Sequence, residues 1–217
     1  VKERLNSKAR ISFARMRKLT EEEINTIAKH LLKETDQGNI ERLLDIFDFH
    51  KFPYDSQFIL DFAKQKGTGK NSIAENALNA LKHLKSKAIR DFALEKIQTA
   101  KNPIDYLELL ISNYRSGDSK LLTEIAEKAK NEHEIERLAG IYTAIFKKNN
   151  TKSCKNPLEI LYSKMNCALH RKDIIEVLLH NNVLSDTIEK ELHYDCNLET
   201  RMIALQAGLQ HPSDRNF

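Results

Sequence analysis

The chain has 217 residues, of which 30% are charged, only 6 are Gly and 4 are Pro, and its formal net charge is +4. This composition favours helices with solvated outer faces and supplies too few turn residues for an all-β fold. No apolar run approaches the roughly 20 residues of a membrane-spanning helix, and residues 1–5 do not begin a signal peptide. The sequence therefore predicts a soluble, all-α protein.

The first segment, residues 1–19, is basic and predicts an amphipathic N-terminal helix or arm. Its apolar residues recur at helical spacing: Leu5, Ala9, Phe13, Met16 and Leu19. Residues 1–18 hold seven Lys and Arg against one Glu, whereas the rest of the chain has 28 basic and 30 acidic residues. The body is thus nearly neutral and a poor general polyanion binder. The candidate binding residues of the arm are Lys2, Arg4, Lys8, Arg10, Arg15, Arg17 and Lys18.

Residues 20–148 predict an array of short helices. Thr20 with Glu23, and Ser72 with Glu75, have the spacing of a capping box. The segment Lys66–Lys70 contains two glycines but lacks the spacing of a phosphate-binding loop, and it predicts a turn between helices. The expected helices run from Thr20 to before Gly38, from a cap at Asn39 to about Phe49, through Phe58–Ala63, Ala77–Leu84 and Ile89–Ile97, from Asn102 to near Gly117, from a cap at Asp118 to Ala129, and through Ile135–Ile145.

The polar stretch 149–155 is the best internal boundary, and residues 156–210 predict further helical hairpins that continue the array. Residues 211–217 have no apolar period and predict a frayed tail. About twelve helices result, and their short links make neighbours antiparallel. The last helices are expected from Asn156 to about Leu169, through Ile174–Leu178, from Ser185, and from Asn197 to before Gly208.

Two helix starts repeat each other, at Asn102–Leu107 and Asn156–Leu161. In each, Asn is placed to cap, Pro takes the first helical position, and an acid follows in the first turn. Two further segments, Arg90–Leu94 and Arg201–Leu205, also match each other. Such recurrence indicates related helical units and carries no chemistry of its own.

The segment Ser86–Leu94 resembles the second helix of a HEAT-type repeat, with a polar lead, an aliphatic residue, Arg, a small residue and Leu. Asn197–Leu205 is similar, and Ile135–Ala139 is a weaker match. The resemblance implies an irregular α-α superhelix, a HEAT-like solenoid, in which Arg90, Arg137 and Arg201 bond to a neighbouring repeat. These arginines are 47 and 64 residues apart, against a HEAT period of roughly 40, so irregular helix pairs or a non-repeating bundle are the alternatives.

Four residues form a C-x2-H … H-x2-C pattern: Cys167, His170, His193 and Cys196. Two such pairs could close a tetrahedral zinc site, but structural zinc pairs normally lie on turns, and here at least one pair falls within an expected helix. We therefore favour a small buried Cys with surface histidines, and expect no metal and no cofactor. Three cysteines predict a reducing, cytoplasmic location, with Cys154 as the exposed thiol.

No catalytic set is specified by the local sequence, and the chain contains no Trp, which argues against the HEAT-like DNA glycosylases. Helical-repeat proteins mostly present a surface to a partner. The sequence therefore predicts a non-catalytic scaffold that binds a protein. Because the chain begins at Val1, we expect it to be part of a larger protein. The alternative is a nucleic-acid-binding protein that uses the basic arm.

Overall fold

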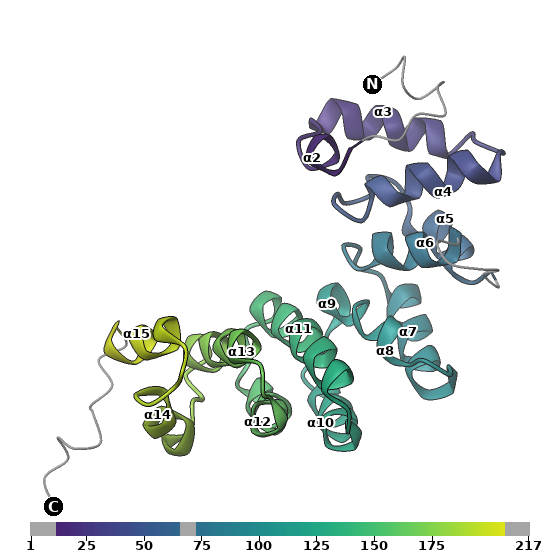
Figure 1. Ribbon diagram of the computed structural model, residues 1–217. Helices are drawn as coiled ribbons and strands as arrows, with labels where there is room; N and C mark the ends of the chain where they lie inside the picture. Colours follow the sequence, from purple (N-terminus) through teal and green to yellow (C-terminus); the bar gives the residue numbers. More distant parts are fainter. Residues whose placement is uncertain (1–11, 66–72, 207–217) are drawn as a thin grey trace, which may run out of the picture. The chain divides into compact units, whose positions relative to one another are not determined.

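The computed structural model describes residues 12–65 and 73–206, and within these ranges the regular structure is helical throughout (Figure 1). The predicted all-α class is confirmed, with fourteen α-helices in the described part where about twelve were expected. None of these helices has the length and apolarity needed to cross a membrane. Most of the N-terminal arm, the turn expected at 66–70 and the tail expected at 211–217 lie outside the described residues.

The chain divides into two compact units, Val1–Asn113 (unit 1) and Tyr114–Phe217 (unit 2). The polar stretch 149–155, expected as the internal boundary, lies inside unit 2. Its polar groups are used in packing there, because the Thr151 N–H donates to Asn181 Oδ1 at 2.6 Å. The Thr151 hydroxyl also caps a short 3-10 turn, Lys152–Cys154. A polar segment can therefore be an internal structural element when its hydrogen bonds are satisfied by the fold.

Unit 1 contains eight of the helices, and its core is rich in aromatic rings. The helix α4 packs on α3 and α6, α5 packs on α6 and α7, and α7 packs on α8 and α9. Phe47 and Phe52 are fully buried and meet edge to face with ring centroids 5.0 Å apart. The helices are α2 (Phe13–Met16), α3 (Glu21–Leu31), α4 (Gln37–Ile46), α5 (Ser56–Ala63), α6 (Ile73–Leu81), α7 (Lys87–Thr99), α8 (Ile104–Leu107) and α9 (Leu110–Asn113).

Unit 2 stacks alternate helices on one another. α10 packs on α12, while α11 packs on α13 and α13 on α15. Among consecutive helices, α11 contacts α12, α12 contacts α13, and α14 contacts α15. Tyr142 is fully buried, and its hydroxyl donates to the Leu122 carbonyl at 2.7 Å. The helices are α10 (Asp118–Lys128), α11 (Glu132–Lys148), α12 (Lys155–Lys164), α13 (Ala168–His180), α14 (Asp186–Leu192) and α15 (Leu198–Gln206).

Two of the predicted helix starts are confirmed by side-chain caps. Thr20 accepts from the Glu23 N–H, and Glu23 accepts from the Thr20 N–H, which makes the capping box at the start of α3 complete. Ser86 accepts from two N–H groups at the start of α7. Each cap satisfies donors that a helix start leaves without an intrahelical partner.

Four other predicted caps are wrong, because the helices begin elsewhere. α4 begins at Gln37, two residues before Asn39, with Asp36 as its cap. α8 follows Pro103, which makes no side-chain cap, and α12 begins at Lys155, so Asn156 lies inside the helix. Asp118 is the first residue of α10 and accepts from the Arg115 N–H. Only α4 uses another capping side chain in place of the predicted one, whereas α8, α10 and α12 begin without a side-chain cap.

Several side chains in unit 1 donate hydrogen bonds to backbone carbonyls near the ends of preceding helices. The residues that donate lie 29 to 35 positions after the carbonyls that accept. Such bonds satisfy carbonyls that a helix leaves free at its C-terminus. The pairs are His50 with Met16, His83 with Asp48, Ser112 with Lys82 and Asn113 with Leu84. In unit 2, Lys164 donates in the same way to three carbonyls at the end of α10, 35 to 38 residues upstream.

Candidate functional site

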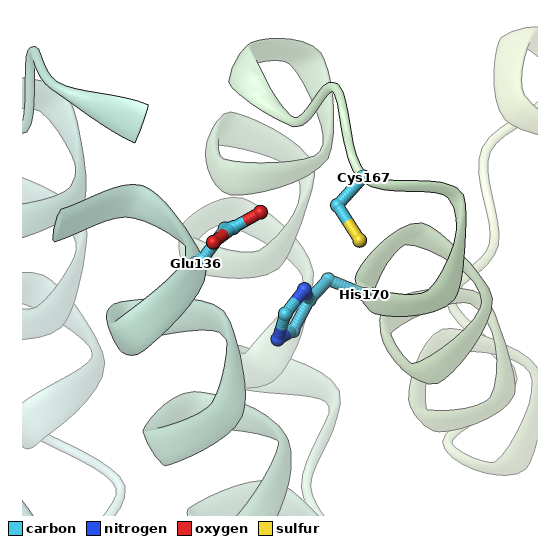
Figure 2. Close-up of side chains that lie close together, drawn as sticks. All are labelled: Glu136, Cys167 and His170. Carbon is cyan, nitrogen blue, oxygen red and sulfur yellow. The ribbon is translucent and has the colours of Figure 1, made fainter. Parts of the chain in front are cut away.

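Three side chains that carry metal-binding atoms converge in unit 2, as Figure 2 shows. Glu136 comes from α11, Cys167 directly precedes α13, and His170 lies in the first turn of α13. Their ligand atoms all lie within 4.8 Å of one another, and each residue is half-buried. Among residues 12–65 and 73–206, no other three His, Cys, Asp or Glu side chains meet in this way.

The start of α13 places the thiol and the imidazole on the same side of the helix. Cys167 is the cap residue, and its carbonyl accepts from the Arg171 N–H at 3.0 Å, while its thiol makes no capping hydrogen bond. Residues three apart at a helix start face the same way, so His170 lies beside Cys167. Glu136 joins them because α11 packs on α13.

The imidazole of His170 has a buried polar atom that the fold does not satisfy. Its Nδ1 is inaccessible to solvent and has no hydrogen-bond partner. Buried polar atoms in native proteins nearly always have a partner, which can be protein, ordered water or a bound ion. The cluster therefore offers a nitrogen that is available to a ligand.

The structure rearranges the predicted four-residue zinc pattern. Cys167 and His170 lie together, but the third member of their cluster is Glu136 rather than a residue of the second pair. Cys196 is exposed, with its Sγ 3.8 Å from the Arg171 guanidinium, and His193 lies at the end of α14. Glu136 was missed because it is 31 residues upstream of Cys167, and no local motif marks an acid on the polar face of a helix.

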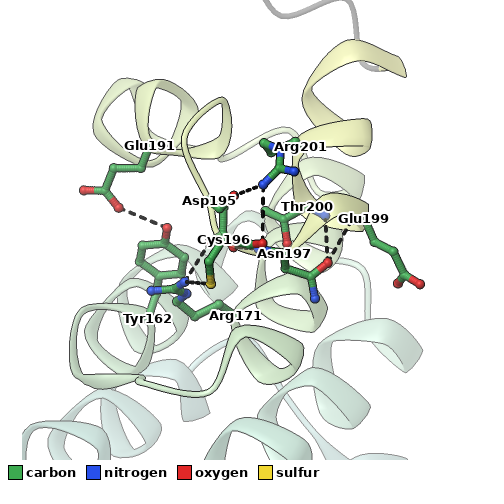
Figure 3. A network of polar contacts seen from close by, with 9 residues as sticks. All are labelled: Tyr162, Arg171, Glu191, Asp195, Cys196, Asn197, Glu199, Thr200 and Arg201. Atoms are coloured by element: carbon green, nitrogen blue, oxygen red, sulfur yellow. Dashed lines mark hydrogen bonds and ion pairs between the residues drawn. The ribbon is translucent and has the colours of Figure 1, made fainter.

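A network of polar contacts fixes the loop between α14 and α15 (Figure 3). The Asp195 side chain is 4% exposed and accepts from the Arg171 guanidinium at 2.8 Å and from the Asn197 N–H at 2.8 Å. Arg201 donates to the Asp195 carbonyl at 2.5 Å and to the Cys196 carbonyl at 3.3 Å. Because the buried carboxylate is paired and hydrogen-bonded, we interpret this network as structural.

Two further pairs lie at the edges of the network. The Tyr162 hydroxyl donates to Glu191 at 3.0 Å, and burial, followed by this hydrogen bond, raises the pKa of Tyr162. Lys172 forms an ion pair with Glu199, which raises the pKa of Lys172 and lowers that of Glu199. Glu191, Lys172 and Glu199 therefore each have a partner within the chain.

The three arginines of the HEAT-like segments have intramolecular partners. Arg90 donates to the Asn113 carbonyl at 2.7 Å, which connects α7 to the end of α9. Arg201 donates to two carbonyls of the loop before its own helix. Arg137, on α11, is also engaged in an interaction within the chain.

The described residues of the basic arm contact other residues of unit 1. Arg15 forms a 2.7 Å ion pair with Glu23 of the capping box, and the Arg17 guanidinium lies 5.4 Å from the centre of the Phe49 ring. Lys18 is exposed. The helix expected over residues 1–19 is represented by α2 alone in the described residues, and Lys2, Arg4, Lys8 and Arg10 lie outside them.

The thiol expected to be exposed is buried instead. Cys154 is 0% exposed, and burial raises the pKa of its thiol to about 11. The prediction failed because the polar residues around Cys154 belong to the 3-10 turn that packs in unit 2, and this turn directs the thiol into the core.

The helix α15 buries one side and exposes apolar residues on the opposite side. Thr200 and Ala204 are fully buried against the unit, whereas Leu198, Met202 and Leu205 are 63%, 43% and 66% exposed. The exposed three recur at i, i+4 and i+7, which places them on a single face. We call these three residues the α15 apolar face.

Unit 1 has an open groove of about 560 Å³ between the start of α3 and the loops at residues 50–54 and 84–85. Its lining mixes acidic, basic and aromatic side chains, among them Glu21, Lys51 and Tyr54. The groove's histidine, His50, already donates to the Met16 carbonyl at 2.6 Å. The groove therefore lacks a set of polar groups that converge on a ligand.

Comparison of the chain with protein-family models, with curated proteins and with solved structures found no match. Two features of unit 2 offer binding chemistry: the α15 apolar face, and the cluster of Glu136, Cys167 and His170.

Proposed function

We propose that this chain is a non-catalytic helical-repeat domain that binds a partner protein, with the α15 apolar face as the contact surface. The observation that carries the proposal is the exposure of Leu198, Met202 and Leu205 on one face of α15. A helix that is buried on one side and apolar on the other is typical of the interior of a helical stack, where a further element covers its second face. We infer that a partner helix provides that cover.

The repeat architecture in this proposal is supported by how the helices are tied together. In unit 2, α10 packs on α12 and α11 on α13. The side chains that donate to helix-end carbonyls lie 29 to 38 residues from those carbonyls in the two units. Helical repeats have periods of roughly 33–47 residues. These contacts support stacked helical hairpins of the HEAT-like kind.

Binding at the α15 apolar face is favourable on energetic grounds. Burying a Leu or Met side chain contributes about 1.5–3 kcal/mol, so three such residues can anchor an interface. Nearby charged groups are already paired inside the chain, as with Lys172 and Glu199. An apolar centre beside satisfied polar groups is the usual anatomy of a protein–protein contact.

The experiment is a cross-linking comparison in cells. A photoreactive amino acid replaces Leu198, and the cross-linked protein is identified by mass spectrometry. We expect one partner protein, which is lost when Met202→Lys and Leu205→Lys are introduced together and kept in Leu32→Lys, where a 40% exposed leucine of unit 1 is changed.

Two results would contradict this proposal. One is a cross-link only to a second copy of this chain, which would make the face a self-association surface. The other is salt-sensitive nucleic-acid binding that is abolished by deletion of residues 1–18 and unaffected by the α15 substitutions, which would favour the basic arm.

A further inference from the structure

We propose that Glu136, Cys167 and His170 bind one Zn²⁺ ion, which joins α11 to α13. This inference is independent of the protein-binding proposal, because it rests on different residues and a different measurement. The starting observation is the convergence of three different ligand types within 4.8 Å in the described part of the chain (Figure 2).

The donor set selects the metal. A thiolate, an imidazole and a carboxylate are the three common protein ligands of Zn²⁺. Mg²⁺ and Ca²⁺ prefer oxygen ligands alone, and iron–sulfur clusters are held by several cysteine thiolates. The combination of Cys167, His170 and Glu136 therefore points to Zn²⁺.

The spacing of the ligand atoms is close to that of a tetrahedral site. With metal–ligand bonds of about 2.0–2.3 Å, neighbouring ligand atoms lie about 3.3–3.7 Å apart. The three atoms here are within 4.8 Å of one another. Rotation about the side-chain bonds of Glu136 and Cys167 closes the difference, since each side chain is half-buried and the packed helices hold the backbones in place.

Charge and hydrogen bonding favour the bound state. The Cys167 thiolate and the Glu136 carboxylate together balance the two positive charges of the ion, so the half-buried complex carries no net charge. A neutral complex avoids the large cost of removing an unbalanced charge from water. Coordination by His170 through Nδ1 also gives a partner to an atom that is buried without one.

The site has three protein ligands, and its partial exposure leaves the fourth position to water. Its two helices are neighbours in unit 2. A bound ion adds a connection between the polar face of α11 and the start of α13, so it stabilises unit 2 against unfolding.

The experiment titrates the chelator-treated full chain with Co²⁺ and then with Zn²⁺. We expect one equivalent of Co²⁺ to produce thiolate-to-metal absorption that Zn²⁺ abolishes, and Zn²⁺ to raise the midpoint of thermal unfolding. Zn²⁺ should also protect Cys167, and not Cys196, from alkylation. This last measurement uses the wild-type protein and does not depend on the folding of a variant.

Matched variants assign the ligands. Cys167→Ser, His170→Gln and Glu136→Gln should each weaken Zn²⁺ binding at least about tenfold. Cys196→Ser and His193→Gln, which remove the same groups from the other sequence pair, should leave it unchanged. Circular dichroism of the metal-free variants shows that each is folded.

Three outcomes would overturn the site. The first is titration without thiolate–cobalt absorption, and the second is Zn²⁺ affinity that survives all three substitutions. The third is loss of binding in Cys196→Ser or His193→Gln, which would assign the metal to the C-x2-H … H-x2-C set.

Discussion

Histidines in the two units meet different surroundings. In unit 1, His50 and His83 each donate from Nε2 to a backbone carbonyl, of Met16 and Asp48 respectively. In unit 2, the Nδ1 of His170 is buried without a partner, beside a thiol and a carboxylate. A histidine in a helical stack can thus have a structural role, in which its ring donates a hydrogen bond to a backbone carbonyl near a helix end. His170 is distinguished by the thiol and the carboxylate that lie beside its ring.

The units also resemble each other in one respect. Asn113 in unit 1 donates to the Leu84 and Leu109 carbonyls and accepts from the Ser86 N–H. Asn181 in unit 2 donates to the Val177 carbonyl and accepts from the Thr151 N–H. Both are buried, and both connect a helix end to an earlier segment. The units share this architectural device, while the metal-ligand cluster belongs to unit 2 among the described residues.

The largest expected effect is a difference between two thiols of unit 2. Burial raises the pKa of Cys154 to about 11, against an ordinary 9.0. This lowers the thiolate fraction near neutral pH about 100-fold, and only the thiolate reacts. We expect Cys196, which is exposed, to be alkylated at least about 100-fold faster at pH 8, as mass spectrometry of the folded protein would show. Equal rates would place Cys154 at the surface.

The next effect compares the two asparagines directly. Asn113→Ala leaves one donor and two acceptors unsatisfied, and we expect it to lower the free energy of unfolding by about 3–5 kcal/mol. Asn181→Ala leaves the Thr151 N–H without its acceptor, while the Val177 carbonyl keeps the bond from the residue 181 backbone N–H, and we expect a loss of about 1–3 kcal/mol. Hydrogen exchange should locate the first loss in unit 1 and the second in unit 2. A greater loss from Asn181→Ala would reverse this ranking.

A smaller effect separates the histidines. His83→Ala removes the hydrogen bond to the Asp48 carbonyl and should cost about 1 kcal/mol of unfolding free energy. His170→Ala in the metal-free protein should cost less than about 0.5 kcal/mol, because the lost packing is offset by removal of a buried, unpartnered nitrogen. Urea unfolding of both variants measures the difference. Equal losses would mean that His170 has a structural partner.

The smallest effect concerns acid stability in unit 1. The Thr20 N–H, with a contribution from Arg15, lowers the pKa of Glu23 below its ordinary 4.5. A carboxyl whose pKa is lower in the folded state stabilises the protein above the unfolded value, and this contribution is lost as pH falls through the folded value. Glu23→Gln should therefore flatten the fall of the thermal midpoint below pH 4.5. An unchanged profile would show that the capping box contributes nothing through charge.

The local sequence was sufficient to predict an interaction where the two interacting groups are neighbours in the chain. Thr20 and Glu23 are three residues apart, so the capping box could be read directly, as could the Ser86 cap. The all-α class followed from composition and from apolar residues at helical spacing. The Asn102 and Asn156 caps failed because α8 begins after Pro103 and α12 begins at Lys155, each without a side-chain cap, and a cap contributes only about 1 kcal/mol to where a helix begins.

The sequence identified two of the three residues of the candidate site as possible metal ligands. Cys167 and His170 stand three residues apart, which is a metal-ligand spacing, but the second pair suggested by the sequence is not the one that the fold brings beside them. Glu136 joins them only because α11 packs on α13. Cys154 shows the same limit, because its polar neighbours indicated exposure and the packing of the 3-10 turn buried it.

The sequence by itself determined that this protein is helical, where most helices lie and which residues are chemically able to bind. Helical periodicity and capping involve residues within about four positions of one another, so a short stretch of sequence is enough to predict them. Only the tertiary structure decided which polar groups find partners, which apolar face of α15 stays exposed, and which acid meets Cys167 and His170. These outcomes depend on contacts between helices some thirty residues apart, and no short stretch of sequence contains both sides of such a contact.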